Sequence, residues 1–382
     1  MNYELIVSIF DFHNESSILL TEIYNPKAIL FLYKKEDENL IYKLKDYYRN
    51  KFENVKFTFF QLDIFDANKL EKVFKDNLDK SILINLTSGK KLDVLLLLQF
   101  AIKNKIVSHY VDIENSLLYE FKDSLVSVEK RKFIDLNIDE VIESNGGSII
   151  VDSTEITEAN AVNWLTDMIS KNLTLWHKLK SKLYDGRVFI HDINNPYFIT
   201  VNSRLLTDEE TAIYYKILNK LKYYGEIDYK IQDNEIKIYF NNNYIKGFIF
   251  KSGTWFEVFT KAIFEEIEYV DQVKNGVLFL WNEDKKKLRN ELDVVAIKDS
   301  LLICISCKDS SKYDEVALNE LNVYADELGG ENVIKILAAT KEPLKASVLE
   351  RAKEMNIHLV VYNGNKNEFK NKLNDILNPS VR

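Results

Sequence analysis

Two strand-like segments near residue 300 hold the side chains with the clearest chemical potential. One segment covers residues 291–297 and contains Asp293, and the other covers residues 301–308 and ends at Lys308. Because side chains alternate along a strand, Ser306 and Lys308 share one face. A tight turn over residues 298–300 joins the segments, so we expect Asp293 to lie near Lys308 at neighbouring strand ends.

An acid and a lysine in a buried sheet are unfavourable unless they pair or bind a metal ion. Hydrolysis of a phosphodiester uses both groups. A carboxylate holds Mg²⁺ or Mn²⁺ through oxygen, the ion activates water, and a lysine stabilises the charge of the transition state. Glu257 lies in an expected amphipathic helix over residues 253–266 and offers a further carboxylate. Glu291 shares the face of Asp293, and its role stays open.

Two other interpretations of this segment remain. The first is that Asp293 and Lys308 form a structural ion pair at a sheet edge. The second treats Cys304 and Cys307 as a redox or zinc-binding pair. A single CxxC without a second pair is a weak signal for zinc, and strand alternation points the two thiols to opposite faces. We therefore expect both cysteines to be small core residues.

A second segment of interest is the run Thr87, Ser88, Gly89 and Lys90, which follows an expected strand and precedes an expected helix over residues 92–103. A small, glycine-containing turn at a helix N-terminus presents free N–H groups and the positive end of the helix dipole, which suits a phosphate. Such turns are also common as plain helix caps. The run is not a Walker A loop, because the leading glycine is missing.

The elements that would position this run alternate between short apolar stretches and amphipathic ones. Expected strands cover residues 3–10, 27–33, 55–62, 81–86 and 106–113, with helices such as 37–51 and 67–78 between them. This alternation predicts a Rossmann-like α/β domain with a parallel sheet and helices on both faces. Ligands of such sheets bind beyond the carboxyl ends of the strands at the topological switch point, which indicates the loops after the first and fourth strands.

The rhythm changes at a glycine pair, residues 146–147, so we place a first domain at 1–147, a linker domain at 148–245 and a third domain at 246–382. The linker has helical patterns over 155–184 and 207–223, then a hairpin pattern over 227–240. A helix followed by a hairpin fits either a winged-helix-like module or a plain structural spacer. The third domain alternates strands and helices again, so we expect an α/β fold there.

Composition places the chain among ordered globular proteins, with 46% hydrophobic and 12% aromatic residues and only 4 prolines. We expect a cytoplasmic protein with no membrane partner, because neither a leader pattern nor an apolar run of membrane-spanning length is present. Its 2 cysteines cannot form a disulfide framework, which suits a reducing compartment. A net charge of -8 excludes a chain coated with basic surface, although an acidic body can keep a local basic groove.

Over residues 250–382 the chain resembles the PD-(D/E)xK nuclease superfamily, in a helix glutamate, a strand aspartate and a lysine that closes the next strand. The resemblance implies a restriction-endonuclease-like α/β domain with Asp293, Lys308, Glu257 and Ser306 at its catalytic centre. Ser306 stands where the superfamily has its second acid, and some of these nucleases replace or move that acid. Ligation of Mg²⁺ or Mn²⁺ then depends on Asp293, Glu257 and the carbonyl of Cys307.

Over residues 1–140 the chain resembles the CRISPR-associated Rossmann-fold domain called CARF, which binds cyclic oligoadenylates. The run after the fourth strand looks like the (T/S)xG(T/K)K-type loop of that domain. The loop over residues 11–16 matches the first loop of CARF in position and polar character. The resemblance implies ligand contacts from Asp11, Asn14, Ser16, Thr87, Ser88, Gly89 and Lys90.

Taken together, a CARF domain, a linker and a PD-(D/E)xK domain resemble the CRISPR ancillary nucleases of type III systems. The resemblance implies a homodimer with one cyclic tetra-adenylate across its twofold axis, and antiviral cleavage of DNA, RNA or both after the ligand binds. One rival is a ligand-responsive transcriptional regulator with a DNA-binding linker and an inactive nuclease-like domain. Another is a scaffold whose first sheet only binds a nucleotide.

Overall fold

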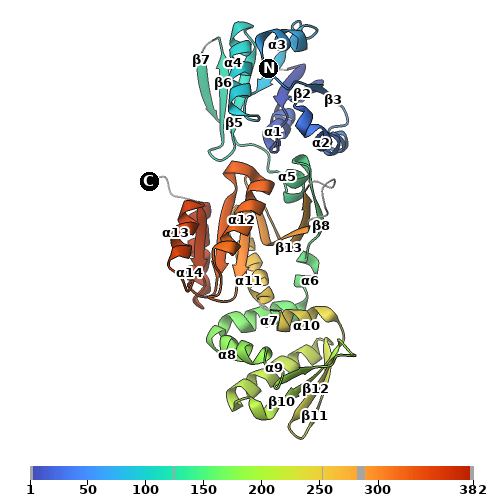
Figure 1. The fold of residues 1–382 in the computed structure, drawn as a ribbon, viewed down its shortest axis with the longest axis vertical. Coiled ribbons are helices and arrows are strands. Elements are labelled where there is room, and N and C mark those ends of the chain that lie inside the picture. The colour runs from blue at the N-terminus through green and yellow to red at the C-terminus, as the bar shows by residue number, and fades with distance from the viewer. Residues whose placement is uncertain (1–2, 124, 252, 282–288, 379–382) are drawn as a thin grey trace.

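The computed structural model describes residues 3–123, 125–251, 253–281 and 289–378. The described residues form three sheets with their helices, arranged one after another along the long axis of the molecule (Figure 1). Residues 379–382 of the predicted third domain lie outside the described residues.

The N-terminal domain is built on a seven-stranded sheet in the order β3-β2-β1-β4-β5-β6-β7. β1 to β5 are parallel and β6 and β7 antiparallel. Helices cover both faces of the parallel part, which explains why every residue of β1 and β4 is buried. The predicted parallel sheet is confirmed, with its switch point between β1 and β4, whereas the β6–β7 hairpin was not predicted. The elements are β1 (Leu5–Ile9), α1 (Glu15–Tyr24), β2 (Ala28–Tyr33), η1 (Lys35–Asp37), α2 (Glu38–Lys51), β3 (Lys56–Gln61), α3 (Ala67–Phe74), β4 (Ile82–Asn85), α4 (Lys91–Lys103), β5 (Val107–Asp112), β6 (Leu117–Lys122), β7 (Leu125–Lys130) and α5 (Ile138–Ser144).

The middle domain has a four-stranded antiparallel sheet in the order β11-β12-β10-β9. The predicted hairpin is β11–β12, and the helix before it starts with a reciprocal capping box between Thr207 and Glu210. The sequence did not reveal β9 and β10, because they contain only three and five residues. The elements are α6 (Thr154–Thr157), α7 (Asn160–Lys171), α8 (Leu173–Leu183), β9 (Phe189–His191), β10 (Phe198–Asn202), η2 (Ser203–Leu205), α9 (Asp208–Tyr223), β11 (Ile227–Gln232), β12 (Glu235–Phe240) and α10 (Asn243–Phe250).

The C-terminal domain has a six-stranded sheet in the order β17-β16-β15-β14-β13-β8. β13, β14 and β15 form an antiparallel meander, and β16 and β17 continue in parallel with β15. The turn between β14 and β15 has positive φ at both Asp299 (51°) and Ser300 (66°), as a two-residue hairpin requires. The elements are α11 (Thr254–Glu265), β13 (Gln272–Trp281), β14 (Arg289–Lys298), β15 (Leu301–Lys308), α12 (Glu315–Gly329), η3 (Gly330–Asn332), β16 (Ile334–Ala339), α13 (Ser347–Glu354), β17 (Ile357–Val361) and α14 (Lys366–Leu377).

The edge strand β8 (Gly147–Val151) changes the domain boundary predicted at Gly147. It pairs with β13, so residues assigned to the linker complete the sheet of the C-terminal domain. A short apolar run after two glycines gives no sign of its partner, because strand pairing across more than 120 residues is a tertiary property.

The spatial order of the domains differs from their order along the chain. The C-terminal domain lies between the other two, with the N-terminal domain at the top of Figure 1 and the middle domain at the bottom. On one face of the central sheet, Val295 shares a core with Val141 of α5 and Leu44 of α2. On the other face, Val294 shares a core with Phe259 of α11 and Leu165 of α7. The N-terminal domain therefore contacts the C-terminal domain directly.

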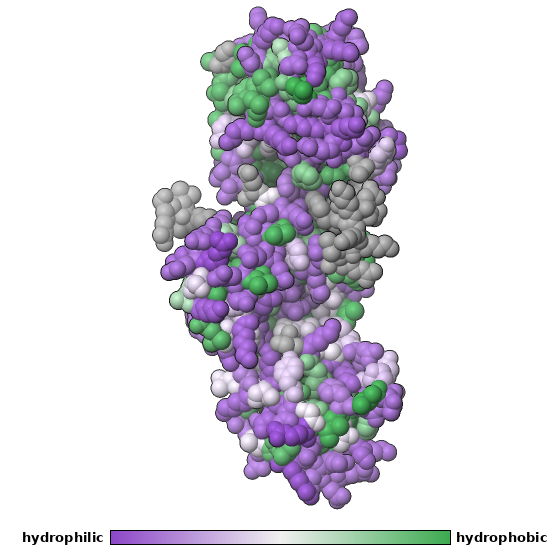
Figure 2. Space-filling model, in the orientation of Figure 1, coloured by the Kyte–Doolittle hydropathy of each residue, from purple (hydrophilic) through white to green (hydrophobic). Residues whose placement is uncertain are grey.

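The visible surface is mostly hydrophilic (Figure 2). Hydrophobic side chains gather on the upper left of the N-terminal domain, where Figure 1 places α4, β6 and β7. The exposed side chains there include Leu92 and Leu95 of α4 and Leu125, Val126 and Val128 of β7. Among the helices that the structure describes, none has the length and apolar character to cross a membrane.

Candidate active site and ligand cavity

Asp293, Ser306 and Lys308 meet where β14 and β15 separate. The paired register of the two strands ends at Val294 and Ile305. Beyond that point the Asp293 carboxylate accepts the backbone N–H of Cys307 at 2.6 Å and the Ser306 hydroxyl at 3.2 Å. Lys308 Nζ lies 3.9 Å from the same oxygen, and both side chains remain partly exposed. The structure thus brings together the acid and the lysine that the sequence selected, within reach of solvent.

Glu257 approaches this group from α11, which packs against β13, β14 and β15. The pKa of Glu257 is raised to about 8, mainly by burial and also by the charges of Asp293 and Glu291, while Lys308 and Lys251 oppose the change. Negative charge therefore exceeds positive charge around these carboxylates. Glu291, whose role the sequence left open, is exposed and contributes to this excess.

The donor atoms fit a divalent cation in kind. The carboxylates of Asp293 and Glu257 and the carbonyl of Cys307 are hard oxygen donors, and a bound cation would offset the excess negative charge. Among the described residues, however, no three His, Cys, Asp or Glu side chains lie close enough to share one ion. Charges influence one another over longer distances than a metal–ligand bond spans. The carboxylates can therefore affect the pKa of Glu257 without lying close enough to share one ion. Ser306 adds a hydroxyl group to this cluster and no carboxylate.

The two cysteines are core residues, as the sequence predicts. Both are buried and free, and they belong to the cores on opposite faces of the sheet. Burial raises the pKa of Cys304 to about 12 and that of Cys307 well above its ordinary value. Because the two thiols lie on opposite faces of the sheet, they form neither a disulfide nor a shared metal site in the described structure.

Two further groups at this site were missed by sequence reasoning. Asp309, the residue after Lys308, is fully buried and accepts hydrogen bonds from α8, α11 and Thr340. The Tyr244 hydroxyl of α10 is buried with no hydrogen-bond partner among the described residues. Burial and the charge of Glu257 raise the pKa of Tyr244 to about 12. No local motif marks either residue, because their neighbours come from distant parts of the chain.

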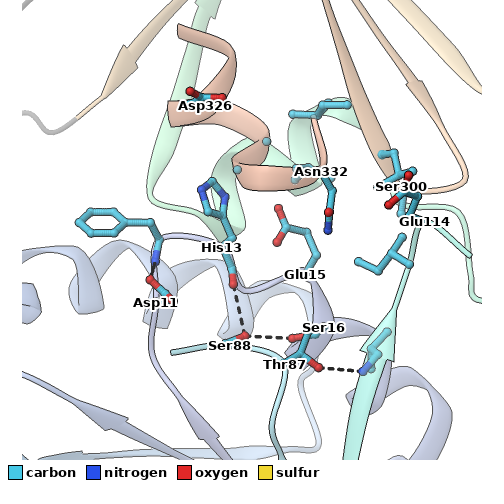
Figure 3. Close-up of a pocket in the computed structure, with 18 of the residues that line it drawn as sticks. Asp11, His13, Glu15, Ser16, Thr87, Ser88, Glu114, Ser300, Asp326 and Asn332 are labelled. Carbon is cyan, nitrogen blue, oxygen red and sulfur yellow. Dashed lines mark hydrogen bonds between the residues drawn. The ribbon is translucent and has the colours of Figure 1, made fainter. Parts of the chain in front are cut away.

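A second site is a cavity of about 940 Å³ between the N-terminal and C-terminal domains (Figure 3). It lies at the carboxyl ends of β1 and β4, where the switch point predicts a ligand. Five of the seven predicted contact residues line it, and the C-terminal domain supplies the opposite wall. The five are Asp11, Ser16, Thr87, Ser88 and Gly89, and the opposite wall includes Ser300, Asn322, Asp326, Gly330 and Asn332.

Hydrogen bonds hold the two loops of this cavity together. The Asp11 carboxylate accepts the N–H of Gly89 at 2.9 Å, and the hydroxyls of Ser16 and Ser88 lie 3.0 Å apart. Gly89 has a φ of +114°, and a Cβ there would lie 2.9 Å from the side chain of Ile9. Thr87 accepts the N–H of Val111 at 2.8 Å. The loops are therefore fixed before any ligand binds.

Asn14 and Lys90 are not among the residues that line the cavity, which differs from the prediction for these two positions. Asn14 is fully buried, and its amide donates to the backbone carbonyl groups of Asp11 and Ser144. Lys90 points outward and pairs with Glu36 at 3.0 Å. A polar residue of a loop motif can point into a cavity or away from it. Buried hydrogen bonds direct Asn14 away from this cavity, and the ion pair with Glu36 directs Lys90 away from it.

The contact between the two domains at the cavity is close. A Cβ at Gly330 would lie 2.7 Å from the His13 ring, so His13 packs directly against the end of α12. Figure 3 shows His13 below this turn of the C-terminal domain, with Glu15 and Asn332 beside it. Burial raises the pKa of Glu15, and a hydrogen bond from Asn145 at 2.6 Å opposes that effect.

Residues 246–378 match a family model described as the Card1-like endonuclease domain. No curated protein sequence matches the chain. Protein VC1899 from Vibrio cholerae is similar over 97% of both chains, with 16% identity and a TM-score of 0.73. Can2 from Sulfobacillus thermosulfidooxidans, solved in complex with cyclic tetra-adenylate, is similar over 98% of both chains, with 15% identity and a TM-score of 0.72. At these identities the whole-chain likeness shows the fold alone, and the family model identifies an endonuclease domain within residues 246–378, as the sequence predicts.

Proposed function

We propose that this protein is a nuclease of type III CRISPR defence that requires a divalent metal ion and is activated by cyclic tetra-adenylate. The observation that carries the proposal is the meeting of Asp293, Lys308 and Glu257 at the open end of β14 and β15. This meeting lies inside the region that matches a Card1-like endonuclease domain. The substrate class that we propose is DNA, RNA or both.

In this proposal Asp293, Glu257 and the Cys307 carbonyl hold Mg²⁺ or Mn²⁺. The bound ion supplies an activated water and offsets charge on the phosphate. Lys308 provides a cation within reach of the scissile phosphate and stabilises the negative charge that develops there. Ser306 donates to Asp293 and so orients that carboxylate.

We propose the cavity between the N-terminal and C-terminal domains as the site of cyclic tetra-adenylate. A protein of the same overall fold, Can2, has been solved with that ligand. The cavity offers the hydroxyl groups of Ser16, Thr87 and Ser88 at the ends of β1 and β4, and such donors suit a phosphate-containing ring. Its volume of about 940 Å³ also reaches the upper part of the range for small-molecule sites.

A homodimer is part of the proposal. The exposed hydrophobic side chains of α4 and β7 form an apolar surface on the N-terminal domain. Such surfaces often mark interfaces between protein chains. Pairing of two N-terminal domains through α4 and β7 would cover these side chains. Because α4 begins two residues after Gly89, this pairing would also bring the two ligand loops toward the twofold axis, across which one cyclic tetra-adenylate would lie. We place the dimer in the cytoplasm, where the two buried, unpaired cysteines suit a reducing compartment.

The β14–β15 hairpin offers a physical link between the two sites. Its turn lines the cavity through Ser300, and its open end carries Asp293 and Lys308. The Ser300 hydroxyl donates to the carbonyl of Ile134 and accepts the N–H of Leu136, both at 2.9 Å. Residues 131–137 connect β7 to α5, the last helix of the N-terminal domain, so the turn is attached to the end of that domain. A ligand that favours one arrangement of this turn would bias the catalytic end.

One rival function has an observation in its favour. A ligand-responsive regulator with an inactive nuclease-like domain agrees with Ser306 in place of an acid. It also agrees with the lack of a three-ligand group among the described residues. In that case the ligand would bind and nothing would be cleaved.

The test is a cleavage assay on plasmid DNA and on single-stranded RNA. Each substrate is incubated with the protein in four conditions, which combine Mn²⁺ or no metal with cyclic tetra-adenylate or no ligand. The proposal expects cleavage mainly when both are present. Binding of the ligand without cleavage of either substrate would instead support the regulator.

A further inference from the structure

Asp309 lies at a junction of three structural units, next to the catalytic end of β15. We propose that Asp309 is a positioning residue that fixes Lys308 and Glu257 relative to each other and makes the middle domain a brace for the active site. This inference rests on the proposed nuclease function. It assigns a role to helix α8, which the sequence left as part of a linker.

The Asp309 carboxylate is fully buried, and both of its oxygen atoms accept hydrogen bonds. Its Oδ2 atom accepts the indole N–H of Trp255 at 2.8 Å, the ammonium of Lys180 at 2.9 Å and the indole N–H of Trp176 at 3.3 Å. Its Oδ1 atom accepts the Thr340 hydroxyl at 2.8 Å and lies 3.0 Å from His177 Nε2. A charge removed from water in this way is stable only when such partners surround it.

These partners come from elements that carry or adjoin the catalytic groups. Trp255 precedes Glu257 by two residues on α11, so the indole bond fixes the first turn of the helix that presents this acid. Lys308 precedes Asp309 directly at the end of β15. Thr340 follows β16, and its N–H donates to the Lys308 carbonyl at 3.0 Å. One carboxylate thus fixes the start of α11 and the end of β15 to the same point.

Helix α8 of the middle domain completes the arrangement. It supplies Trp176, His177 and Lys180, which lie on one face of the helix at helical spacing. Lys180 Nζ contacts both the carboxylate and the backbone carbonyl of Asp309. The second contact restrains the backbone immediately after Lys308. The pairing of β15 with β14 ends at Ile305, so Lys308 is held in the sheet by β16 alone, and the contact from Lys180 adds a second restraint.

The arrangement predicts a consequence that a plain spacer would not have. A change on α8, in another domain, should lower the rate of phosphodiester cleavage without changing how the nucleic acid binds. Misplacement of a catalytic group by about 1 Å can lower a rate about 100-fold. We therefore expect Lys180→Met to lower kcat by about 10- to 100-fold, with KM for the nucleic acid unchanged within error. Lys180→Arg keeps the cation and should restore most of the rate.

The matched control is Lys335→Met. Lys335 is buried to a similar degree in the C-terminal domain and forms an ion pair of the same length, 2.9 Å, with Asp326. It lies near the start of β16, away from the catalytic end. Rates are measured with cyclic tetra-adenylate and Mn²⁺ at saturation, because Asp326 also lines the ligand cavity. Lys335→Met should then keep the wild-type kcat.

A second measurement does not depend on activity. The protein is labelled with 5-fluorotryptophan, and ¹⁹F NMR follows its four tryptophans, with signals assigned by single Trp→Phe variants. Lys180→Met should move the signals of Trp176 and Trp255, whose indoles share the Asp309 oxygen. If Lys180→Met does not fold, Thr340→Val removes a single hydrogen bond to Asp309 and should give the same pattern with a smaller loss of rate.

The outcomes separate the two proposals. Moved signals together with a lower kcat at constant KM support the positioning role. Moved signals with a wild-type kcat would overturn it and leave the proposed nuclease function intact. Unmoved signals would also overturn it, because the shared carboxylate would not be organised as described. If the wild-type protein cleaves nothing in any condition, the proposed function fails, and the positioning role fails with it.

Discussion

The cavity and the catalytic cluster both lie at the ends of strands, but they differ in how their polar groups are satisfied. At the cavity, Asp11, Ser16 and Ser88 already have hydrogen-bond partners within the two loops. At the catalytic end of β14 and β15, the carboxylates exceed the nearby cations, and the pKa of Glu257 is raised to about 8. At the cavity, these hydrogen bonds hold the two loops in place without any ligand. At the catalytic end, a bound cation would favour the charged form of Glu257, which burial disfavours.

This contrast indicates different sensitivities for the two regions. Loss of a charged group or of the metal ion should remove catalysis and leave the cavity unchanged. A change in the shape of the cavity should alter the ligand concentration required and leave the chemistry unchanged. The following predictions test this separation, beginning with the largest effect.

Removal of the metal ion should have the largest effect. We expect EDTA to stop cleavage completely, because the proposed water activation depends on the ion. Binding of cyclic tetra-adenylate, measured by isothermal titration calorimetry in the same buffer, should persist. Restored cleavage after excess Mn²⁺ is the control. Cleavage that survives EDTA would exclude the proposed chemistry.

Asp293→Asn and Lys308→Ala should each lower the cleavage rate by about 100- to 1,000-fold, since each removes a charge that stabilises the transition state. Ligand affinity should remain near the wild-type value, because the cavity keeps its hydrogen bonds. Initial rates and calorimetry on the same preparations provide the comparison. An equal loss of cleavage and of ligand binding would indicate misfolding instead of a separate catalytic site.

Gly89→Val should shift activation without changing the chemistry. The added side chain would meet Ile9 at a φ of +114°, and we expect the half-activating ligand concentration to rise by about 5- to 150-fold from roughly 1–3 kcal/mol of strain. Gly225→Val is a matched control, since Gly225 also has positive φ but lies in open space in the middle domain. A wild-type response of Gly89→Val would mean that this loop is only a helix cap.

Ser306→Glu should lower the metal concentration needed for half-maximal cleavage by about tenfold, because a third carboxylate would join the acids at the end of β15. The comparison of Mg²⁺ with Mn²⁺ titrations shows whether the preference between the ions also changes. Ser306→Ala removes the hydroxyl without adding charge and serves as the control. Identical metal titrations for Ser306→Glu and the wild-type protein would place residue 306 outside the metal site.

Lys90→Glu should have the smallest effect on activation, although the loop motif predicts a ligand contact at this position. In the structure Lys90 pairs with Glu36 away from the cavity, and solvent screens such an exposed ion pair. We expect the half-activating concentration of cyclic tetra-adenylate, measured by titration as for Gly89→Val, to change less than about threefold. Asp11→Ala, which removes the acceptor of the Gly89 N–H, should have a clearly larger effect. A shift as large as that of Asp11→Ala would return Lys90 to the ligand site.

The sequence allowed most of the N-terminal sheet to be predicted, because its strands are apolar runs separated by amphipathic helices. The five parallel strands differ from their predicted bounds by at most two residues at either end. The hairpin with Asp293 and Lys308 was also predicted, since its alternation and its tight turn are local signals. Short strands such as β9 carry too few residues for a periodic pattern.

Contacts between distant segments could not be predicted. β8 joins the C-terminal sheet, and the C-terminal domain lies between the other two. No residue pattern in the sequence predicts either arrangement. The same limit applies within the sites. Asn14 belongs to a polar loop, but Asn145 and Ser144 decide its direction. In the sequence, Asp309 is an acid at the end of a strand like many others. Its role depends on contacts with α8, which lies more than 120 residues earlier in the chain.

The central claim is that a ligand in the cavity controls a metal site in a separate part of the molecule. A single titration of cyclic tetra-adenylate tests it, with bound ligand and cleavage rate measured in the same samples at saturating Mn²⁺. The account predicts that both quantities rise together and reach half of their maximum at the same ligand concentration. A cleavage rate that stays constant while the cavity fills would contradict it.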